Sequence, residues 1–226
     1  MGPLAAGPNP GAVRHARPRT RGALNTDIIV HPRLQHYGLI TAQLDAVVDW
    51  YRIVLGMSVN HRAGVPPEAV RHGKPFSAFA FVSNDERDHR VVFFQIPNVS
   101  VDPDRRRHTG LQHVAFERPT LDDLLGTYVR LKRSGIAPVW AADHGVGISF
   151  YYEDPDRNIV ELNVNNYSDV WTATEHIRPS RPHVAWVDPD KLLAAREKGL
   201  SRWQVHERAT AGALAPDTPY DPAAHF

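Results

Sequence analysis

Apolar residues recur with two different periods along the chain, and the changes of period predict its elements. From Thr41 the apolar positions follow the 3.6-residue period of a helix, which Gly56 would end. Residues 34–40 (LQHYGLI), which precede this helix, look like a short strand. Strand-like runs follow at 57–63, 76–83 and 90–96. The first part of the chain therefore predicts the order β-α-β-β-β.

The same order is predicted a second time further along the chain. Thr120 can cap a helix, with Asp123 three positions on, and Gly135 would end that helix. Strands are predicted at 111–117 before this helix and at 137–141, 147–153 and 159–164 after it. Both first strands contain the tripeptide Leu-Gln-His, at 34–36 and 111–113. The recurrence indicates an internal duplication.

Two such modules predict an α+β fold, with each module contributing a curved sheet. We expect modules at about 34–97 and 111–166, which together form a cup-shaped mixed sheet within a domain at 31–168. Residues 1–30 are rich in Gly, Pro, Ala and Arg and predict a flexible N-terminal arm. Residues 64–75 form a Pro-containing insertion, and 169–226 a C-terminal extension with a short helix at 188–198.

Composition narrows the functional classes. The formal net charge of +1 gives no electrostatic case for nucleic acid or a membrane surface as partner. We find no apolar run long enough for a membrane span and no signal peptide, and we expect a cytoplasmic protein. The absence of cysteine removes disulfides and thiolate sites, which leaves His, Asp and Glu for any metal chemistry.

Three polar residues stand out in the apolar strands. His36 and His113 lie between apolar neighbours in the first strand of each module, and Glu161 interrupts the apolar last strand of the second. A Glu in such surroundings is costly to bury unless it is paired or binds a metal. Two His and one carboxylate are the ligand set of non-haem Fe(II) oxygenases. The alternative, that each is an ordinary strand residue, stays open at this point.

Residues 34–166 resemble the vicinal-oxygen-chelate superfamily (glyoxalase, bleomycin-resistance and extradiol dioxygenase proteins), and within it the type I extradiol catechol dioxygenases. The stretches that carry the resemblance are LQHYGL, DERDHRVVFF, LQHVAFE and DHGVGISFYYEDPDRNIVEL. The last is the most specific, because it combines a His, a Ser-Phe-Tyr strand, an Asp-Pro-Asp turn and a Glu.

This resemblance implies a set of site residues and an activity. It implies His36, His113 and Glu161 as ligands of Fe(II), with Mn(II) as the alternative metal. It implies that His89 lies beside the oxygen-binding position, and that Tyr151 and His144 lie near the substrate oxygens. The activity implied is extradiol (meta) ring cleavage, in which O2 is inserted into a catechol-type aromatic diol. A homo-oligomer is common on this fold.

Two other functions on the same scaffold stay open. A non-oxidative glyoxalase-like isomerase or lyase usually takes a further carboxylate ligand from the last strand of the first module. Here that strand, 90–96, offers only Gln95. A metal-free small-molecule binding or resistance protein would need neither the three ligands nor His89.

Overall fold

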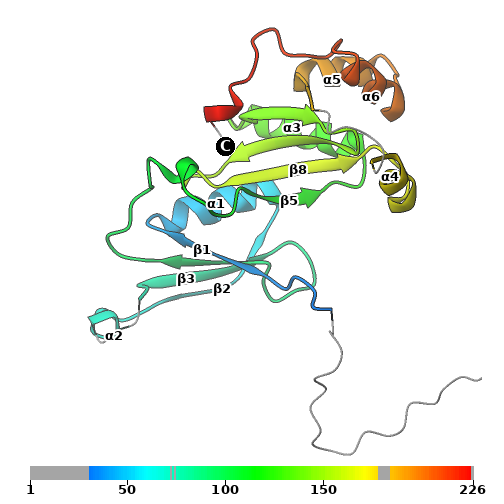
Figure 1. Ribbon diagram of the computed structural model, residues 1–226. Coiled ribbons are helices and arrows are strands. Elements are labelled where there is room, and N and C mark those ends of the chain that lie inside the picture. The colour runs from blue at the N-terminus through cyan, green and yellow to red at the C-terminus, as the bar shows by residue number, and fades with distance from the viewer. Residues whose placement is uncertain (1–30, 72, 74, 178–183, 225–226) are drawn as a thin grey trace, which may run out of the picture. The chain divides into compact units, whose positions relative to one another are not determined.

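The computed structural model describes residues 31–71, 73, 75–177 and 184–224 (Figure 1). The arm expected at 1–30 lies outside these residues. The elements in chain order are β1 (Tyr37–Thr41), α1 (Leu44–Leu55), β2 (Ser58–Gly64), α2 (Pro67–Arg71), β3 (Ala78–Ser83), β4 (Val91–Gln95), the 3-10 turn η1 (Arg105–Arg107), β5 (His113–Glu117), α3 (Leu121–Arg133), β6 (Trp140–Asp143), β7 (Gly147–Glu153), β8 (Ile159–Asn165), α4 (Val170–Ile177), β9 (Ala185–Trp186), α5 (Pro189–Glu197), α6 (Arg202–Thr210) and η2 (Pro222–Ala224).

The described strands form two sheets that repeat one topology. The first sheet has the order β1-β4-β3-β2, and the second has the order β5-β8-β7-β6-β9. In each, the first strand of a module pairs in parallel with its last strand, and the strands between run antiparallel. The predicted β-α-β-β-β order is therefore confirmed in both modules.

The sheets do not join into one closed cup. β1 and β5 are edge strands of their own sheets, with no strand paired to their outer sides in the described part of the chain. The α+β class and the two modules are confirmed, each module contributing its own mixed sheet, one of four and one of five strands, which stay separate. The reason is physical: a continuous sheet would need a hydrogen-bonded ladder between those two edges.

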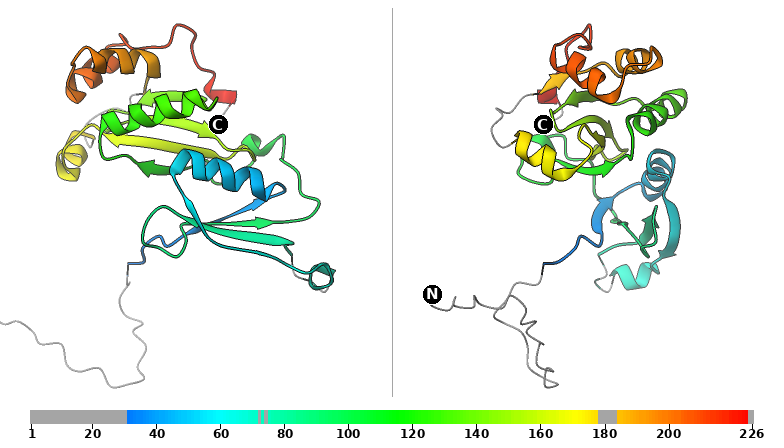
Figure 2. Two further views of the ribbon diagram at one scale, coloured as in Figure 1. Left: turned by 180° about the vertical axis from the view of Figure 1, so that it is seen from behind. Right: turned by 90° about the vertical axis from the view of Figure 1, so that its right-hand side faces the viewer.

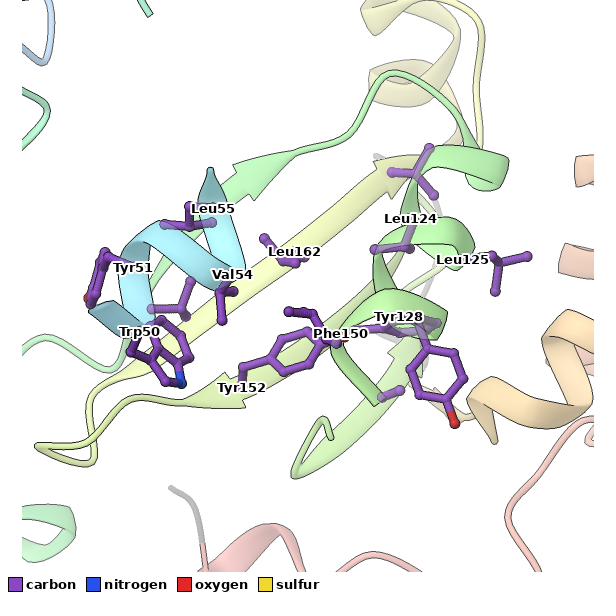
Figure 3. Close-up of a cluster of buried hydrophobic side chains, with 14 of the residues drawn as sticks. Trp50, Tyr51, Val54, Leu55, Leu124, Leu125, Tyr128, Phe150, Tyr152 and Leu162 are labelled. Atoms are coloured by element: carbon purple, nitrogen blue, oxygen red, sulfur yellow. The ribbon is translucent and has the colours of Figure 1, made fainter. Parts of the chain in front are cut away.

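One cluster of buried hydrophobic residues joins α1 and α3 to strands of both sheets. Figure 2 shows these helices and strands as ribbons from two further sides. Figure 3 shows Val54 and Leu55 of α1 beside Leu162 of β8, with Leu124 of α3 further along the same core. Successive side chains of a strand point to opposite faces of its sheet. Because Leu162 points into this core, its neighbour Glu161 points to the opposite face of the second sheet.

The helix ends follow the signals in the sequence. The Thr120 hydroxyl accepts a hydrogen bond from the Asp123 amide (3.1 Å), as the predicted cap requires. Gly56 and Gly135 have φ values of +68° and +76°, a left-handed conformation that favours glycine at the end of a helix.

The C-terminal extension adds β9, α5 and α6 to the second module (Figure 1). β9 pairs with β6, and the Arg196 guanidinium on α5 binds the Asp122 carboxylate on α3 (2.6 Å). The helix expected at 188–198 is thus confirmed as α5. No helix among the described residues is long and apolar enough to cross a membrane.

Candidate active site

His113 and Glu161 meet on one face of the second sheet. β5 and β8 run parallel with Ala115 opposite Glu161, and His113 lies two residues before Ala115, on the same face. The Nε2 atom of His113 is 2.9 Å from Oε2 of Glu161. The topology therefore brings together two residues that are far apart in the sequence.

The Glu161 carboxylate is buried and held in its ionised form. Its Oε1 atom accepts hydrogen bonds from the Ser149 hydroxyl (2.6 Å) and the Asn163 amide (3.0 Å). Burial raises the pKa of Glu161, but the hydrogen bonds from His113, Ser149 and Asn163 outweigh it and lower the pKa to about 2. At neutral pH the site holds a negative charge whose Oε2 faces His113.

The glutamine of each Leu-Gln-His tripeptide contacts the histidine that follows it. Oε1 of Gln112 contacts Nδ1 of His113, and Oε1 of Gln35 contacts Nδ1 of His36. When Nδ1–H donates to an amide oxygen, Nε2 is the ring nitrogen left for a metal, which it binds once it carries no proton. The repeated tripeptide thus prepares both histidines in the same way.

The His113–Glu161 pair fits two ligands of a divalent ion. A proton on Nε2 makes the hydrogen bond to the carboxylate at 2.9 Å, and a metal cation can take the place of that proton, because metal binding releases it. Two ligand atoms at right angles around an ion, with bonds of about 2.0–2.2 Å, lie roughly 3 Å apart. The separation of this pair matches that geometry.

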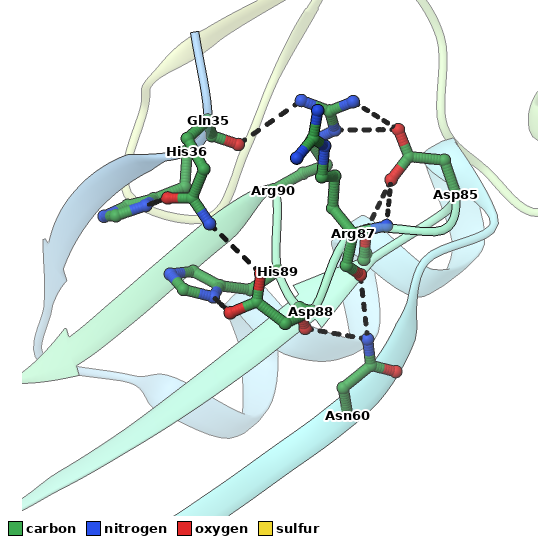
Figure 4. A network of polar contacts seen from close by, with 9 residues as sticks. Gln35, His36, Asn60, Asp85, Arg87, Asp88, His89 and Arg90 are labelled. Carbon is green, nitrogen blue, oxygen red and sulfur yellow. Dashed lines mark hydrogen bonds and ion pairs between the residues drawn. The ribbon is translucent and has the colours of Figure 1, made fainter. Parts of the chain in front are cut away.

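His36 lies in a different environment, beside His89 (Figure 4). The two rings are 4.3 Å apart between centroids. The Gln35 amide donates to Asp88 (3.1 Å), and Asp88 accepts from Nδ1 of His89 (2.6 Å). The ring of Phe81 stacks on His89 at 4.2 Å. Side chains on both sides therefore fix the orientation of His89.

The predicted site residues thus form two groups. His113, Glu161, Tyr151 and His144 lie together on the second sheet, whereas His36 and His89 lie together at the first sheet. Among the described residues, no group of three or more His, Asp or Glu side chains is placed to hold a metal ion. The three-ligand set stays a prediction, of which two members are side by side.

Tyr151 and His144 form a hydrogen-bonded pair next to His113. The Tyr151 hydroxyl lies 2.9 Å from Nε2 of His144, and the Tyr151 ring meets His113 edge-on at 5.6 Å. Burial raises the pKa of Tyr151 and lowers the pKa of His144. A neutral phenol and a neutral imidazole therefore share this hydrogen bond, and Trp140 holds the phenol ring by stacking on it at 4.4 Å.

A cavity of about 680 Å³ lies between β1 and the start of β5. Its wall includes Tyr37, Thr41, Tyr51 and Asp156, and His113 is the predicted site residue that reaches it. The cavity therefore gives small molecules a way to approach His113 from the side of β1.

Sequence reasoning missed the residues that hold Glu161 and the histidines in place. Ser149 and Asn163 gave no signal, because Ser and Asn are ordinary on the polar face of a strand. Gln35 and Gln112 did give a signal, since they belong to the repeated tripeptide, but only the histidines were assigned a role.

Comparison with known proteins identifies the family of the chain. Residues 33–162 match the family described as the Glyoxalase/Bleomycin resistance protein/Dioxygenase superfamily. The chain is 39% identical over 187 residues to biphenyl-2,3-diol 1,2-dioxygenase 3 of Rhodococcus globerulus, which covers 80% of this chain and 91% of that protein. It is 32% identical over 192 residues to biphenyl-2,3-diol 1,2-dioxygenase 2 of the same organism, covering 83% and 94%.

A solved structure shows the same fold. The glyoxylase/bleomycin resistance protein/dioxygenase domain from Frankia sp. EAN1pec superposes with a TM-score of 0.51 at 20% identity, and covers 62% of this chain and 96% of that one. The resemblance predicted from the sequence is therefore confirmed. With a family match over more than half of its length and two relatives aligned over most of it, the chain belongs to the glyoxalase/bleomycin resistance protein/dioxygenase superfamily.

Proposed function

We propose that this protein is an extradiol dioxygenase, which cleaves a catechol-type aromatic diol beside its two hydroxyl groups and inserts both atoms of O2. The observation that carries the proposal is the His113–Glu161 pair, with the Tyr151–His144 pair next to it on the same sheet. The names of the relatives, biphenyl-2,3-diol 1,2-dioxygenases, supply the reaction and the substrate class.

The proposed metal is Fe(II), held by His36, His113 and Glu161. His113 and Glu161 support this at ligand spacing, and His36 supports it through its matching place and its matching Gln35 contact in the first module. When bound, Fe(II) supplies a Lewis acid for the diol oxygens and electrons for O2. The proposal requires the His36 imidazole to approach the pair when the metal binds.

The residues around the pair then have distinct roles. The ionised Glu161 offsets part of the charge of a cation. The neutral imidazole of His144 can accept a proton from a diol hydroxyl, and the Tyr151 hydroxyl can orient a substrate oxygen by hydrogen bonding. Asp88 binds Nδ1 of His89 and leaves its Nε2 available as an acid or base on the side of His36.

Anaerobic reconstitution with Fe(II), followed by air and a panel of diols that includes biphenyl-2,3-diol, tests the proposal. We expect oxygen uptake that matches formation of a yellow ring-opened semialdehyde. His36→Ala and Glu161→Ala should lose both metal and activity, and His89→Ala should retain metal but turn over slowly. Glu117→Ala, which removes an exposed carboxylate on β5, is the matched control and should behave as the natural protein.

The other outcomes separate the alternatives. Firm metal binding without oxygen uptake on any diol would favour an isomerase or lyase on the same fold. A protein that binds no divalent metal would contradict the proposal and favour a small-molecule binding protein.

A further inference from the structure

A buried, hydrogen-bonded Asp–His pair joins the C-terminal extension to the second sheet. Asp143, the last residue of β6, is fully buried, and His206 on α6 is 7% exposed. Nδ1 of His206 donates to Oδ2 of Asp143 at 2.8 Å. A buried carboxylate needs such a partner, because an unpaired charge away from water is very costly.

The other oxygen of Asp143 holds the turn that carries His144. Oδ1 accepts hydrogen bonds from the Gly145 amide (2.8 Å) and from the Asn166 side chain (3.1 Å). The same Asn166 amide group also donates to the Gly145 carbonyl (3.1 Å). Gly145 has a φ of +84°, a conformation that favours glycine, so the path of this turn is closely specified.

His144 therefore stands between two fixed residues. The Asp143 carboxylate anchors the backbone on either side of it, and the His144 amide donates to the Gly147 carbonyl (2.9 Å). The imidazole meets the Tyr151 hydroxyl from this turn. A change in the position of Asp143 would thus move the His144 ring relative to Tyr151 and His113.

We propose that His206 is a positioning residue for His144, and acts through Asp143. Tyr151 and His144 are not part of α6. His206 on α6 instead holds the Asp143 carboxylate, which binds the turn that carries His144. The inference rests on the proposed function for the role of His144 in turnover, whereas the positioning of the ring is a structural claim. If so, the C-terminal extension does more than pack on the second module: it positions a side chain of the proposed active site.

Three variants separate positioning from stability. His206→Ala removes the donor, and His206→Asn puts an amide nitrogen in the place of Nδ1. Arg196→Ala is the matched control, because it breaks another contact of the extension, to Asp122, away from the His144 turn. We expect His206→Ala to lower kcat/KM for biphenyl-2,3-diol roughly 10- to 100-fold. His206→Asn should recover most of this loss, and Arg196→Ala should leave kcat/KM unchanged.

A second measurement tests whether the effect passes through His144. In a His144→Ala background, His206→Ala should cause no further loss of kcat/KM, because the residue it positions is absent. The His144 imidazole signal in a long-range 1H–15N spectrum, assigned by its loss in His144→Ala, should shift in His206→Ala and stay in place in Arg196→Ala. This signal needs no turnover.

The outcomes are distinct. An unmoved His144 signal, with a rate loss in His206→Ala no larger than in Arg196→Ala, would overturn the inference. If the natural protein cleaves no diol, the proposed function fails, and the His144 signal still decides the positioning. If His206→Ala does not fold, Asn166→Ala, which removes another contact of Asp143, takes its place with the same expectations.

Discussion

The hydroxyl of Ser149 lies 2.6 Å from Oε1 of Glu161 and so determines which carboxylate oxygen faces His113. Ser149 and Glu161 come from neighbouring strands, β7 and β8, and point to the same face of the sheet. Oε1 is occupied by Ser149 and Asn163, which leaves Oε2 directed at Nε2 of His113. Outer hydrogen bonds of this kind orient a ligand and tune its basicity.

Ser149→Ala should therefore weaken metal binding without removing a ligand. Loss of one of the two hydrogen bonds to Oε1 frees the carboxylate to rotate, and we expect a fall in Fe(II) or Mn(II) affinity of roughly 10-fold. Anaerobic calorimetric titration measures it. Ser134→Ala, which lies beyond the end of α3, is the control and should bind as the natural protein. Equal affinities for all three proteins would contradict the proposed role of Glu161.

Tyr151→Phe should lower turnover while metal affinity is retained. The change removes the hydroxyl that contacts His144 and keeps the ring that stacks on Trp140. A positioned acid–base group contributes about 10²–10⁴-fold to a rate, and we expect a loss of kcat near the lower end. Tyr152→Phe on the same strand is the matched control, because the structure gives its buried hydroxyl no hydrogen-bond partner. A Tyr152 variant as slow as the Tyr151 variant would point to packing as the cause.

Asp154 should make the protein less stable as the pH rises from about 4 to about 6. Burial raises the pKa of Asp154 to about 6, although hydrogen bonds from Asn158 lower it. Because its pKa is raised in the folded state, Asp154 holds its proton more tightly in the folded protein than in the unfolded chain. Its contribution to the free energy of unfolding is therefore lost as the pH rises through the folded-state pKa. Urea unfolding at pH 4.5 and 6.5 should show a smaller decrease for Asp154→Asn than for the natural protein. Asp217→Asn, at an exposed position, should keep the natural slope.

Arg130→Met should destabilise the contact between the two modules. The Arg130 guanidinium on α3 donates to the carbonyls of Ile53 (2.6 Å) and Val54 (3.4 Å) at the end of α1, where a positive charge is favourable. We expect a loss of about 1 kcal/mol in the free energy of unfolding, since the side chain is exposed. Arg133→Met on the same helix, measured by the same urea titration, should lose less. A larger loss in the Arg133 variant would refute this role of Arg130.

Much of the fold could be predicted because each module follows a regular pattern. The strand at 147–153 and the cap at Thr120 were predicted as the structure has them. The strand expected at 137–141 is observed as β6 at Trp140–Asp143, since Pro138 lacks the N–H that a ladder needs. The short helices α2, α4 and α6 were not predicted, because helices of this length depend on tertiary contacts more than on their own sequence.

The site was predicted in part for a related reason. His113 and Glu161 interrupt apolar strands, so the pattern singles them out, and the parallel pairing of their strands brings them together. The distance of His36 from that pair depends on the relative position of the edge strands β1 and β5, which belong to separate sheets. No local sequence pattern encodes that position. The pairing of Asp143 with His206 likewise joins segments 63 residues apart in the sequence.

The parallel pairing of β5 with β8 has a consequence for biogenesis. His113 emerges from the ribosome well before Glu161, and the strands β6 and β7 lie between them in the chain. The two side chains can meet only when β8 inserts between β5 and β7, which is the closing step of the module. Contacts of such long sequence separation form late and slowly. A nascent chain that has not yet released β8 therefore has no carboxylate opposite His113, and metal capture by this pair must await the synthesis and insertion of β8.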